Sequence, residues 1–469
     1  MSTARLRDRV RQVRRQLTTA PDLARRRGVL LATRIHLPEA AAASFRLDGV
    51  EKALAGHDVP VRVLTTTPPA AAGAGNGTAK DSQEAQPAYR DPEGVSVSRW
   101  PALRDASGYL RGYVPYMSFD VPLLGRLLVQ PRPDVVLVEP PPTTGVVVRV
   151  AAALRGLPYV WYAPDVWSVA ATSTSAPGVV LAAVRAMESF AVRGAQRVIA
   201  VNEEVADKVR QLGAHDVEVV PNGIDTSVFD TAGDLPRAQE RQEMGITGPY
   251  AVYAGTASEW QDAGVFARAL AAVRRDHPSA QVLYLGQGSD WEAIAQAAAQ
   301  IPAGADGAPA VVMHGLMPPE QAARWQRGAA CALVSIKPGL GYDFAYPTKV
   351  LAALACGTPV LYAGPGPVTD DVAAHDLGWV ARHEDGDVAR ALSEAFAADA
   401  RLDPAGRQER AARLHGWVEA HRSLRATGEA VAHLMREVVL ERRARPDLLT
   451  RLGERLRQVR QARDVRERR

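Results

Sequence analysis

The chain has few cysteines and no long apolar run, and both shortages narrow what it can be. Its 469 residues include only two cysteines, Cys331 and Cys356. Both lie in apolar surroundings, which predicts buried thiols in a reducing compartment instead of a disulfide or a metal pair. The longest apolar runs, such as 146–154, are interrupted by Arg and are shorter than the roughly 20 residues that span a bilayer. We therefore expect no signal peptide, no transmembrane helix and a cytoplasmic protein.

Net charge is also small, at +4, but it is unevenly distributed. Residues 1–27 contain nine Arg against two Asp, and residues 441–469 contain eleven Arg against five acidic residues. The stretch between them, 28–440, is left with a net charge of −9. A nucleic-acid-binding protein carries its basic patch on the folded module, so an acidic body with two basic tails predicts no nucleic acid partner.

Each basic tail carries a narrow apolar stripe at helical spacing. Leu6, Val10 and Val13 share one helical face near the N-terminus, and Leu452 and Leu456 do the same near the C-terminus. A basic amphipathic helix can lie on an anionic membrane surface, which would place the protein at the inner face of the plasma membrane. The alternative is that each helix docks on the body or on the other tail.

Strand-like and helix-like segments alternate along the body in two series. The first series occupies 28–222, and residues 68–93 interrupt it with an aperiodic Ala-, Pro- and Gly-rich stretch that we interpret as a flexible insertion. The second begins at Tyr250, within a domain that we place at 223–415. Residues 416–440 are expected to form a helix that packs back on the body. Repeated β–α alternation predicts an α/β fold of two Rossmann-like domains facing each other across a crevice, with ligands at the carboxyl ends of the strands.

Residues 335–361 are the most informative segment. A strand-like run ends at Lys337, and Pro347, Thr348 and Lys349 open an Ala- and Leu-rich helix that stops near Cys356. The N–H groups of a first helical turn have no intrahelical partner, and the helix dipole adds positive potential there. Lys349 is disfavoured in that turn unless an anion is bound, so the segment predicts a phosphate site.

Small residues end the other strands of the second series. They include Gly255-Thr256, Gly286, Gly288 and Gly315. Each glycine by itself is explained by a tight turn, but together they favour a ligand that approaches the backbone closely. Gly286 and Gly288 lack the third glycine of the dinucleotide fingerprint, so an NAD site is a weak interpretation.

Acidic residues end strands of the first series. Asp165, followed by Trp167, could accept a hydrogen bond from an acceptor hydroxyl, or it could cap the next helix. Glu39 and Glu139 occupy similar positions and are further candidates for acceptor binding. No spacing of His, Cys, Asp or Glu predicts a metal site.

These motifs together resemble the retaining GT-B glycosyltransferases of family 4, and most closely the bacterial envelope and exopolysaccharide branch that includes fucosamine-transferase-like proteins. The resemblance covers roughly residues 28–436. It rests on six segments: Ile336-Lys337, the run from Pro347 to Val360, Val220 to Asp225, Asp165-Val166-Trp167, Leu37-Pro38-Glu39, and Gly255-Thr256.

The resemblance implies transfer of a sugar from a nucleoside-diphosphate sugar to an acceptor hydroxyl, with retention and without a metal or other cofactor. Lys337 and Lys349 would stabilise the departing diphosphate, and Asp165 would orient the acceptor, which is expected to be a lipid-linked or envelope saccharide. The remaining implied contacts are donor binding by Gly255, Thr256, Gly315, Asp343, Pro347 and Thr348, and acceptor binding by Glu39, Glu139 and Trp167.

The chain departs from the family at two carboxylates. The helix glutamate that holds the nucleotide ribose falls on Ala352, and the first member of the Glu-x7-Glu pair falls on Phe344. Asp343 is one residue away and could serve the donor sugar. A second hypothesis is therefore a non-catalytic GT-B partner that binds a sugar nucleotide within a transferase assembly. An epimerase or phosphorylase on the same fold is a third, less favoured one.

Overall fold

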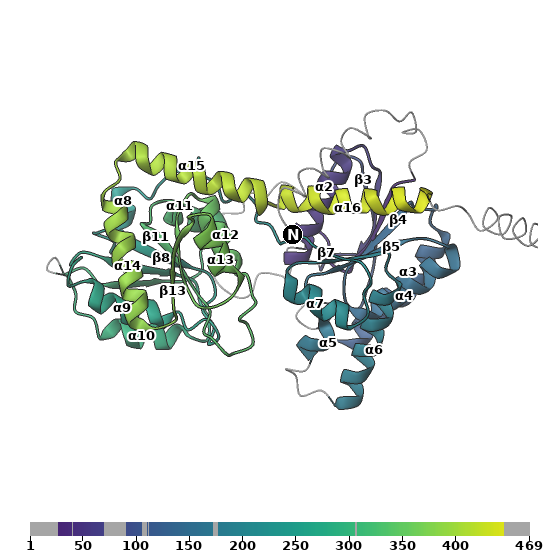
Figure 1. The fold of residues 1–469 in the computed structure, drawn as a ribbon, viewed down its shortest axis with the longest axis horizontal. Coiled ribbons are helices and arrows are strands. Elements are labelled where there is room, and N and C mark those ends of the chain that lie inside the picture. Colours follow the sequence, from purple (N-terminus) through teal and green to yellow (C-terminus); the bar gives the residue numbers. More distant parts are fainter. Residues whose placement is uncertain are drawn as a thin grey trace, which may run out of the picture. The chain divides into compact units, whose positions relative to one another are not determined.

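The computed structural model describes residues 27–39, 41–69, 91–105, 110, 112–171, 177–304 and 307–444. The two predicted basic tails, apart from their inner ends, and most of the predicted insertion 68–93 lie outside the described residues. The chain divides into two compact units (Figure 1). Unit 1 contains the described residues up to Pro221 and those from Gly428 onward, and unit 2 is Asn222–Thr427.

Unit 1 is built on a seven-stranded parallel sheet with the order β3-β2-β1-β4-β5-β6-β7. Its central strands are runs of Val, Leu, Ala and aromatic residues that are buried along their whole length, as expected where helices cover both faces of a parallel sheet. The strands are β1 (Val29–Ala32), β2 (Val61–Thr66), β3 (Val95–Trp100), β4 (Val135–Val138), β5 (Tyr159–Ala163), β6 (Arg197–Ala200) and β7 (Val217–Val219).

The strand order of unit 1 reverses at β1, and this reversal decides where its helices lie. Because crossovers between parallel strands are right-handed, α2 lies on one face of the sheet and α3, α4, α6 and α7 lie on the other (Figure 1). The long C-terminal helix packs on the α2 face, with Gly428 directly against the backbone of Gly49. The helices are α2 (Ala42–Gly56), α3 (Tyr113–Val129), α4 (Pro142–Arg155), α5 (Trp167–Ala170), α6 (Gly178–Gly194), α7 (Glu203–Gln211) and α16 (Leu424–Ala444).

Unit 2 contains a six-stranded parallel sheet with the order β10-β9-β8-β11-β12-β13. Its strands are β8 (Tyr250–Ala254), β9 (Gln281–Leu285), β10 (Val311–His314), β11 (Cys331–Ser335), β12 (Val360–Ala363) and β13 (Gly378–Ala381). Its helices are α8 (Ala238–Glu243), α9 (Gly264–Val273), α10 (Trp291–Ala299), α11 (Pro319–Arg327), α12 (Thr348–Ala355), α13 (Pro367–Ala374), α14 (Asp385–Ala400) and α15 (Pro404–His421).

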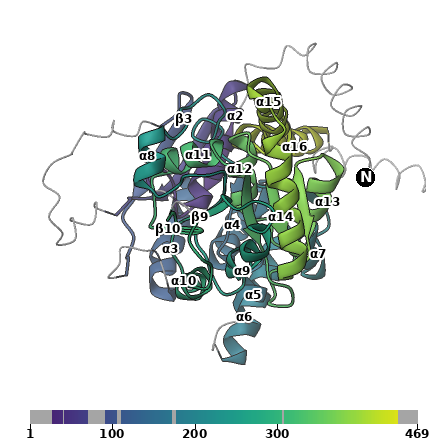
Figure 2. The same ribbon diagram turned by 90° about the vertical axis from the view of Figure 1, so that its left-hand side faces the viewer.

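Two hydrophobic clusters fill the two faces of the unit 2 sheet. One joins the sheet to α9, α10 and α14, and the other joins it to α11, α12, α13 and α15. Figure 2 shows these helices from a direction at right angles to that of Figure 1. Cys331 and Cys356 are buried free thiols. This confirms the predicted thiol state of both residues. The two parallel α/β units also confirm the predicted fold class.

The C-terminal segment differs from the single helix predicted for 416–440. The structure has two helices, which meet at Arg422 and Ser423. α15 packs against α12 in unit 2, whereas α16 passes into unit 1 and packs on α2. The interruption is fixed by tertiary contacts, because Ile224 hydrogen-bonds to the backbone of Arg422 and Leu424 on either side of it. Among the described helices, none is long and apolar enough to cross a bilayer.

Candidate functional site

A hollow of about 420 Å³ lies at the carboxyl edge of the unit 2 sheet. Fourteen described residues line it, and they come from the ends of β8 and β9, the loop after β10, α11, the start of α12 and the segment after Asn222. They are Ile224, Phe229, Ala254, Gly255, Thr256, Leu285, Leu316, Met317, Pro319, Ala322, Gln326, Thr348, Lys349 and Ala352. Most are apolar, and Lys349 is the only charged residue among them.

Lys349 is a half-buried lysine whose ammonium has no counter-ion among the described residues. Its Nζ lies 5.4 Å from the ring centroid of Tyr253, and no carboxylate of the described residues forms an ion pair with it. Desolvation lowers the pKa of Lys349 to about 8, with no carboxylate to raise it. A partly buried cation with no counter-ion among the described residues favours the binding of an anion.

Gly255 makes room for this lysine. Its φ of +119° is a conformation that side-chain-bearing residues rarely adopt, and a Cβ built there would lie 2.9 Å from Cε of Lys349. The start of α12 adds backbone donors, since the helix begins at Thr348 after Pro347 without a side-chain cap. The predicted donor residues Gly255, Thr256, Thr348 and Lys349 therefore line one hollow. Pro347 is buried beside it.

Lys337 and Asp343 are not among the residues that line the hollow. Lys337 is half exposed, and its Nζ lies 3.6 Å from Oδ2 of Asp262. The carboxylate of Asp343 accepts a hydrogen bond from the backbone N–H of Gly339 at 3.0 Å. Gly315 precedes the lining residue Leu316 and does not line the hollow itself.

The wall of the hollow contains no carboxylate where the family resemblance implies one. Ala352 lies one turn after Thr348 and lines the hollow. None of the fourteen lining residues is Asp or Glu. Any ribose bound there would meet apolar side chains, the hydroxyls of Thr256 and Thr348, and Gln326.

A second group of polar residues lies at the carboxyl edge of the unit 1 sheet. Arg34, Glu139 and Asp165 follow the adjacent strands β1, β4 and β5. β1 and β4 flank the point where the strand order reverses, which is where ligands bind in open α/β sheets. The predicted acceptor residues Glu139 and Asp165 are thus brought to one edge, together with Arg34, which the sequence analysis missed.

Arg34 is only 7% exposed, and its Nε and Nη1 atoms have no hydrogen-bond partner within the described part of the chain. Its guanidinium lies 4.0 Å from the ring centroid of Tyr116 and 5.8 Å from that of Trp167. Tyr116 and Trp167 meet edge to face. Buried donors without partners beside aromatic rings offer contacts for a polar ligand with an apolar face, and a sugar ring is such a ligand.

Asp165 does not cap the helix that follows it, so the capping alternative is wrong. α5 begins at Trp167, and the N–H groups of Trp167 and Ser168 are both bonded by the carboxylate of Glu188, each at 2.8 Å. Desolvation and then the negative charge of Glu188 raise the pKa of Asp165 to about 6. Asp165 is at the same time an exposed residue.

Glu39 and Glu139 are both held by arginines. The two carboxylate oxygens of Glu39 accept hydrogen bonds from Arg104 at 3.1 and 2.8 Å. Oε1 of Glu139 accepts from Nε and Nη2 of Arg46 at 3.1 and 2.6 Å, and both partners are buried. These arginines fix the orientation of the two carboxylates.

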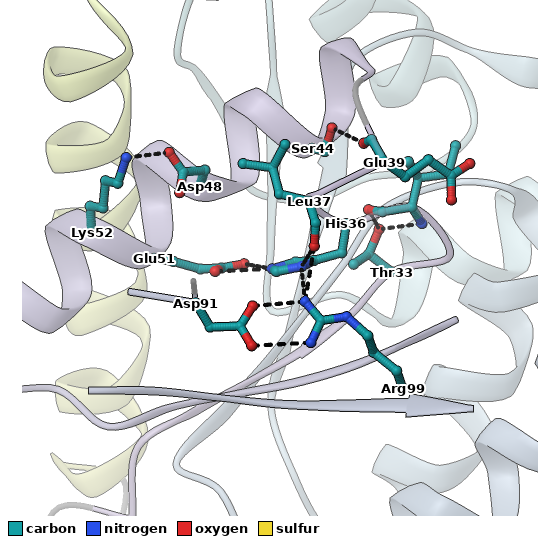
Figure 3. A network of polar contacts seen from close by, with 11 residues as sticks. Thr33, His36, Leu37, Glu39, Ser44, Asp48, Glu51, Lys52, Asp91 and Arg99 are labelled. Carbon is teal, nitrogen blue, oxygen red and sulfur yellow. Dashed lines mark hydrogen bonds and ion pairs between the residues drawn. The ribbon is translucent and has the colours of Figure 1, made fainter. Parts of the chain in front are cut away.

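A buried network supports the loop that carries Arg34 and Glu39 (Figure 3). His36 Nε2 lies 3.0 Å from Glu51 of α2, and its Nδ1 bonds the carbonyl oxygen of Leu37. Burial opposes the charge on His36, but the hydrogen bond and negative charge of Glu51 outweigh it and raise the pKa of the imidazole. Arg99 joins the same carbonyl to Asp91. The loop is therefore tied to both α2 and β3.

Of the site residues that the sequence analysis missed, one could have been found from sequence and three could not. Arg34 lies two residues after the end of β1, as Asp165 does after β5, so the rule that selected Asp165 and Glu139 would also have selected it. Arg46, Glu188 and Tyr116 lie inside helices, where nothing in the local pattern separates them from ordinary helical residues.

Comparison with known proteins gives two family matches. Residues 43–223 match the family described as "Glycosyl transferase 4-like domain", and residues 248–398 match "Glycosyl transferases group 1". No curated protein matches the chain in sequence. The first matched region lies almost entirely in unit 1, and the second lies entirely in unit 2.

Solved structures with the same fold span most of the chain at low identity. Sucrose-phosphate synthase from Thermosynechococcus elongatus is 15% identical with a TM-score of 0.56, and the match covers 89% of this chain and 100% of that one. HepE of Anabaena, in complex with UDP, is 14% identical with a TM-score of 0.59, covering 87% and 100%.

A third solved structure is WaaG, a glycosyltransferase involved in lipopolysaccharide biosynthesis. It is 14% identical with a TM-score of 0.53, covering 87% of this chain and 99% of that one. Two family matches that together cover most of the chain, on two parallel α/β units of the matching fold, place this chain among the GT-B glycosyltransferases.

Proposed function

We propose that the protein transfers a glycosyl group from a nucleoside-diphosphate sugar to an acceptor hydroxyl, with retention and without a metal. The observation that carries this proposal is Lys349, a half-buried ammonium with no counter-ion among the described residues, in a mostly apolar hollow beside the start of α12. A departing diphosphate needs fixed positive charge and N–H donors where its own negative charge develops.

The hollow offers separate surfaces for the parts of a donor. Phe229, Leu316 and Met317 supply an apolar wall for a base. Thr256, Thr348 and Lys349 supply the polar side for the diphosphate. The structure of HepE, which shares the fold, holds UDP, and this supports a nucleoside diphosphate as the ligand class.

Lys337, Gly315 and Asp343 keep the donor-binding roles that the resemblance implies as proposals. Lys337 follows β11 at the same sheet edge, and its contact with Asp262 is long and half exposed. Such a side chain can turn toward a bound diphosphate at low cost, because an exposed ion pair contributes about 0–1 kcal/mol.

The acceptor is proposed to bind at the carboxyl edge of the unit 1 sheet. Asp165 would accept a hydrogen bond from the attacking hydroxyl, and Trp167 would contact the acceptor ring. Glu39 and Glu139, whose orientations Arg104 and Arg46 fix, would also contact the acceptor. A lipid-linked or envelope saccharide is the proposed acceptor class, as in the fucosamine-transferase-like branch, and the fold shared with WaaG supports it.

Calorimetry with a panel of UDP-, GDP- and dTDP-sugars, combined with a donor-hydrolysis assay, tests the proposal. We expect one base to bind and its sugar donor to be hydrolysed slowly without acceptor. Binding without turnover under any acceptor would favour the non-catalytic partner instead. Absence of binding by every member of the panel would contradict the assignment of the hollow.

Donor affinity is expected to fall as the pH rises through about 8. The bound diphosphate favours the charged form of Lys349 and so raises its pKa above the value of about 8 in the free protein. Below that value the lysine is already protonated and affinity is constant. Above it, binding takes up a proton, and affinity falls by at most about tenfold per pH unit.

The diphosphate of a sugar nucleotide does not itself titrate in this range, so calorimetry across it reports the lysine. Lys349→Arg is the matched control, because its guanidinium stays charged and its pH profile should be flat. A wild-type profile as flat as that of the arginine variant would contradict the proposed contact.

The hollow is expected to discriminate weakly between ribose and deoxyribose. No carboxylate lines it, so a ribose hydroxyl gains no charge-assisted hydrogen bond, which contributes about 1.5–3 kcal/mol elsewhere. We expect UDP and dUDP to differ by about threefold or less in dissociation constant. Ala352→Glu should increase that ratio. A wild-type preference of a hundredfold for UDP would show that a carboxylate reaches the site from elsewhere.

A further inference from the structure

Unit 1 exposes an unusual number of large apolar side chains on four consecutive helices. Nineteen such side chains are exposed among the described residues, and eleven of them lie on α3–α6: five on α3, two on α4, one on α5 and three on α6. They are Tyr113, Val114, Val121, Leu128, Val129, Val150, Leu154, Val169, Val179, Val180 and Phe190. We refer to these eleven residues as the apolar face.

The helices that carry the apolar face are neighbours in one layer. α4 packs against α3 on one side and α6 on the other, on the sheet face opposite α2 and α16 (Figure 1). On α3, Val114, Val121 and Leu128 recur every seven residues, so they share one side of the helix. This side is turned away from the core, because all three residues are exposed.

The exposed charges on α3–α6 themselves are of one sign. α3–α6 contain two acidic residues, Asp120 and Glu188, and both are buried at 0% and 1% exposure. Their solvent-accessible charges are arginines, among them Arg149, Arg185 and Arg193. The guanidinium of Arg149 lies 3.9 Å from the ring centroid of Phe190, within the face itself. The body of the chain, residues 28–440, has by contrast a net charge of −9.

More cations gather where α3 and α4 end. Arg132 bonds the terminal carbonyls of α4 at Arg155 and Gly156, and Arg442 also bonds that of Gly156. Burial and then the charges of Arg27, Arg155 and Arg442 lower the pKa of Arg132, so these guanidinium groups are close enough to repel one another. Caps for helix ends explain the individual contacts. Capping does not explain why these four arginines lie close together, with Asp134 accepting a hydrogen bond from the backbone N–H of Arg27.

Three kinds of partner could cover such a surface, and the charge of each partner distinguishes between them. The chain's own tails carry nine and eleven Arg and would be repelled. A second copy docked by two-fold symmetry would set the same positive face against itself. An anionic bilayer accepts the apolar side chains below its headgroups and attracts the arginines, each of which contributes about 1 kcal/mol.

We propose that the apolar face of α3–α6 lies on the surface of an anionic lipid bilayer. The exposed Val, Leu and Phe side chains enter the boundary between headgroups and acyl chains, and the arginines contact lipid phosphates. This attachment belongs to described helices of unit 1 and is separate from any contribution of the tails. It does not depend on the proposed transfer reaction.

Co-sedimentation of the full chain with phosphatidylcholine vesicles, with and without one third phosphatidylglycerol, tests the proposal. The wild type should bind the anionic vesicles, and less so in high salt. Leu154→Glu, at a position that is 70% exposed, should weaken binding by about tenfold or more, because it removes buried apolar area and adds a repelled charge. Leu235→Glu in unit 2, at a position that is 58% exposed, is the matched control and should bind like the wild type.

A second pair keeps the test valid if Leu154→Glu fails to fold. Arg185→Glu, on α6, should weaken anionic binding several-fold, whereas Arg275→Glu at an exposed position of unit 2 should not. Thermal unfolding and donor binding should be unchanged in all four variants. Failure of the wild type to bind would overturn the proposal. So would equal binding by both members of each pair, which would assign attachment to the tails. A wild-type dimer in sedimentation velocity that Leu154→Glu dissociates would assign the face to a second copy.

Discussion

Lys349→Ala is expected to lower the rate of glycosyl transfer by on the order of 10²-fold or more, with a large loss of nucleoside-diphosphate affinity. Lys349 is the only charged residue among those that line the unit 2 hollow, so no other side chain of its lining can replace it. Its charge acts where the diphosphate leaves, which is where fixed positive charge stabilises a transition state most. Steady-state kinetics with the donor found in the binding panel, and calorimetry with its nucleoside diphosphate, measure both effects.

The same substitution should leave the fold intact, which separates function from stability. The pKa of Lys349 is lowered in the folded protein, so protonated Lys349 disfavours folding at pH values below about 8. This penalty disappears as the pH rises toward the ordinary lysine value, about 10.4. Removing the lysine therefore should not lower the melting temperature at neutral pH. Lys208→Ala, in a partly exposed surface pair, is the control for both measurements. An unimpaired transfer rate in Lys349→Ala would refute the proposed diphosphate site.

Glu139→Ala is expected to lower the free energy of unfolding by about 3–5 kcal/mol. Arg46 and Glu139 form a buried ion pair with a shortest N–O distance of 2.6 Å, and both side chains are less than a tenth exposed. Removing the carboxylate leaves the guanidinium of Arg46 buried without its partner, and that penalty is much larger than the net contribution of the pair. Urea denaturation followed by circular dichroism gives the value.

An exposed pair elsewhere in unit 1 provides the comparison. Glu204 pairs with Lys208 one turn along α7, and Glu204→Ala should cost about 0.5 kcal/mol or less. Replacing both Arg46 and Glu139 by Met should restore much of the stability that Glu139→Ala loses, because neither charge is then left unpaired. A loss below about 1 kcal/mol in Glu139→Ala would mean that Arg46 is solvated or finds another acceptor.

The fold followed from local patterns because those patterns are set by burial. Strands such as Val135–Val138 are covered on both faces and must be wholly apolar, and the helices between them show their own periodicity. The one error in the described C-terminal region, a single helix over 416–440, arose where the sequence has no Pro or Gly to mark an end. There the boundary at Arg422 and Ser423 is made by hydrogen bonds to Ile224, a residue far away in the chain.

The candidate sites were predicted less completely than the fold. Positions at strand ends identified Asp165, Glu139 and the start of α12, since parallel strands bring their carboxyl ends to one edge. The same rule does not tell which of two lysines enters the hollow. Lys349 enters it, and Lys337 lies beside Asp262. Nor does it identify Glu188, which leaves Asp165 without a capping role.

By itself, the sequence determined the two α/β units, the sheet edges at which the candidate sites lie and the alanine at position 352, where the family resemblance implies a carboxylate. These features depend on residue types and on their spacing along the chain, which can be read directly from the sequence. Only the tertiary structure decided that Lys349 is half-buried with no counter-ion among the described residues, that two donors of Arg34 have no partner among them, and that α3–α6 share an exposed apolar face. Those properties depend on which distant residues come together, because desolvation and pairing are set by neighbours in space.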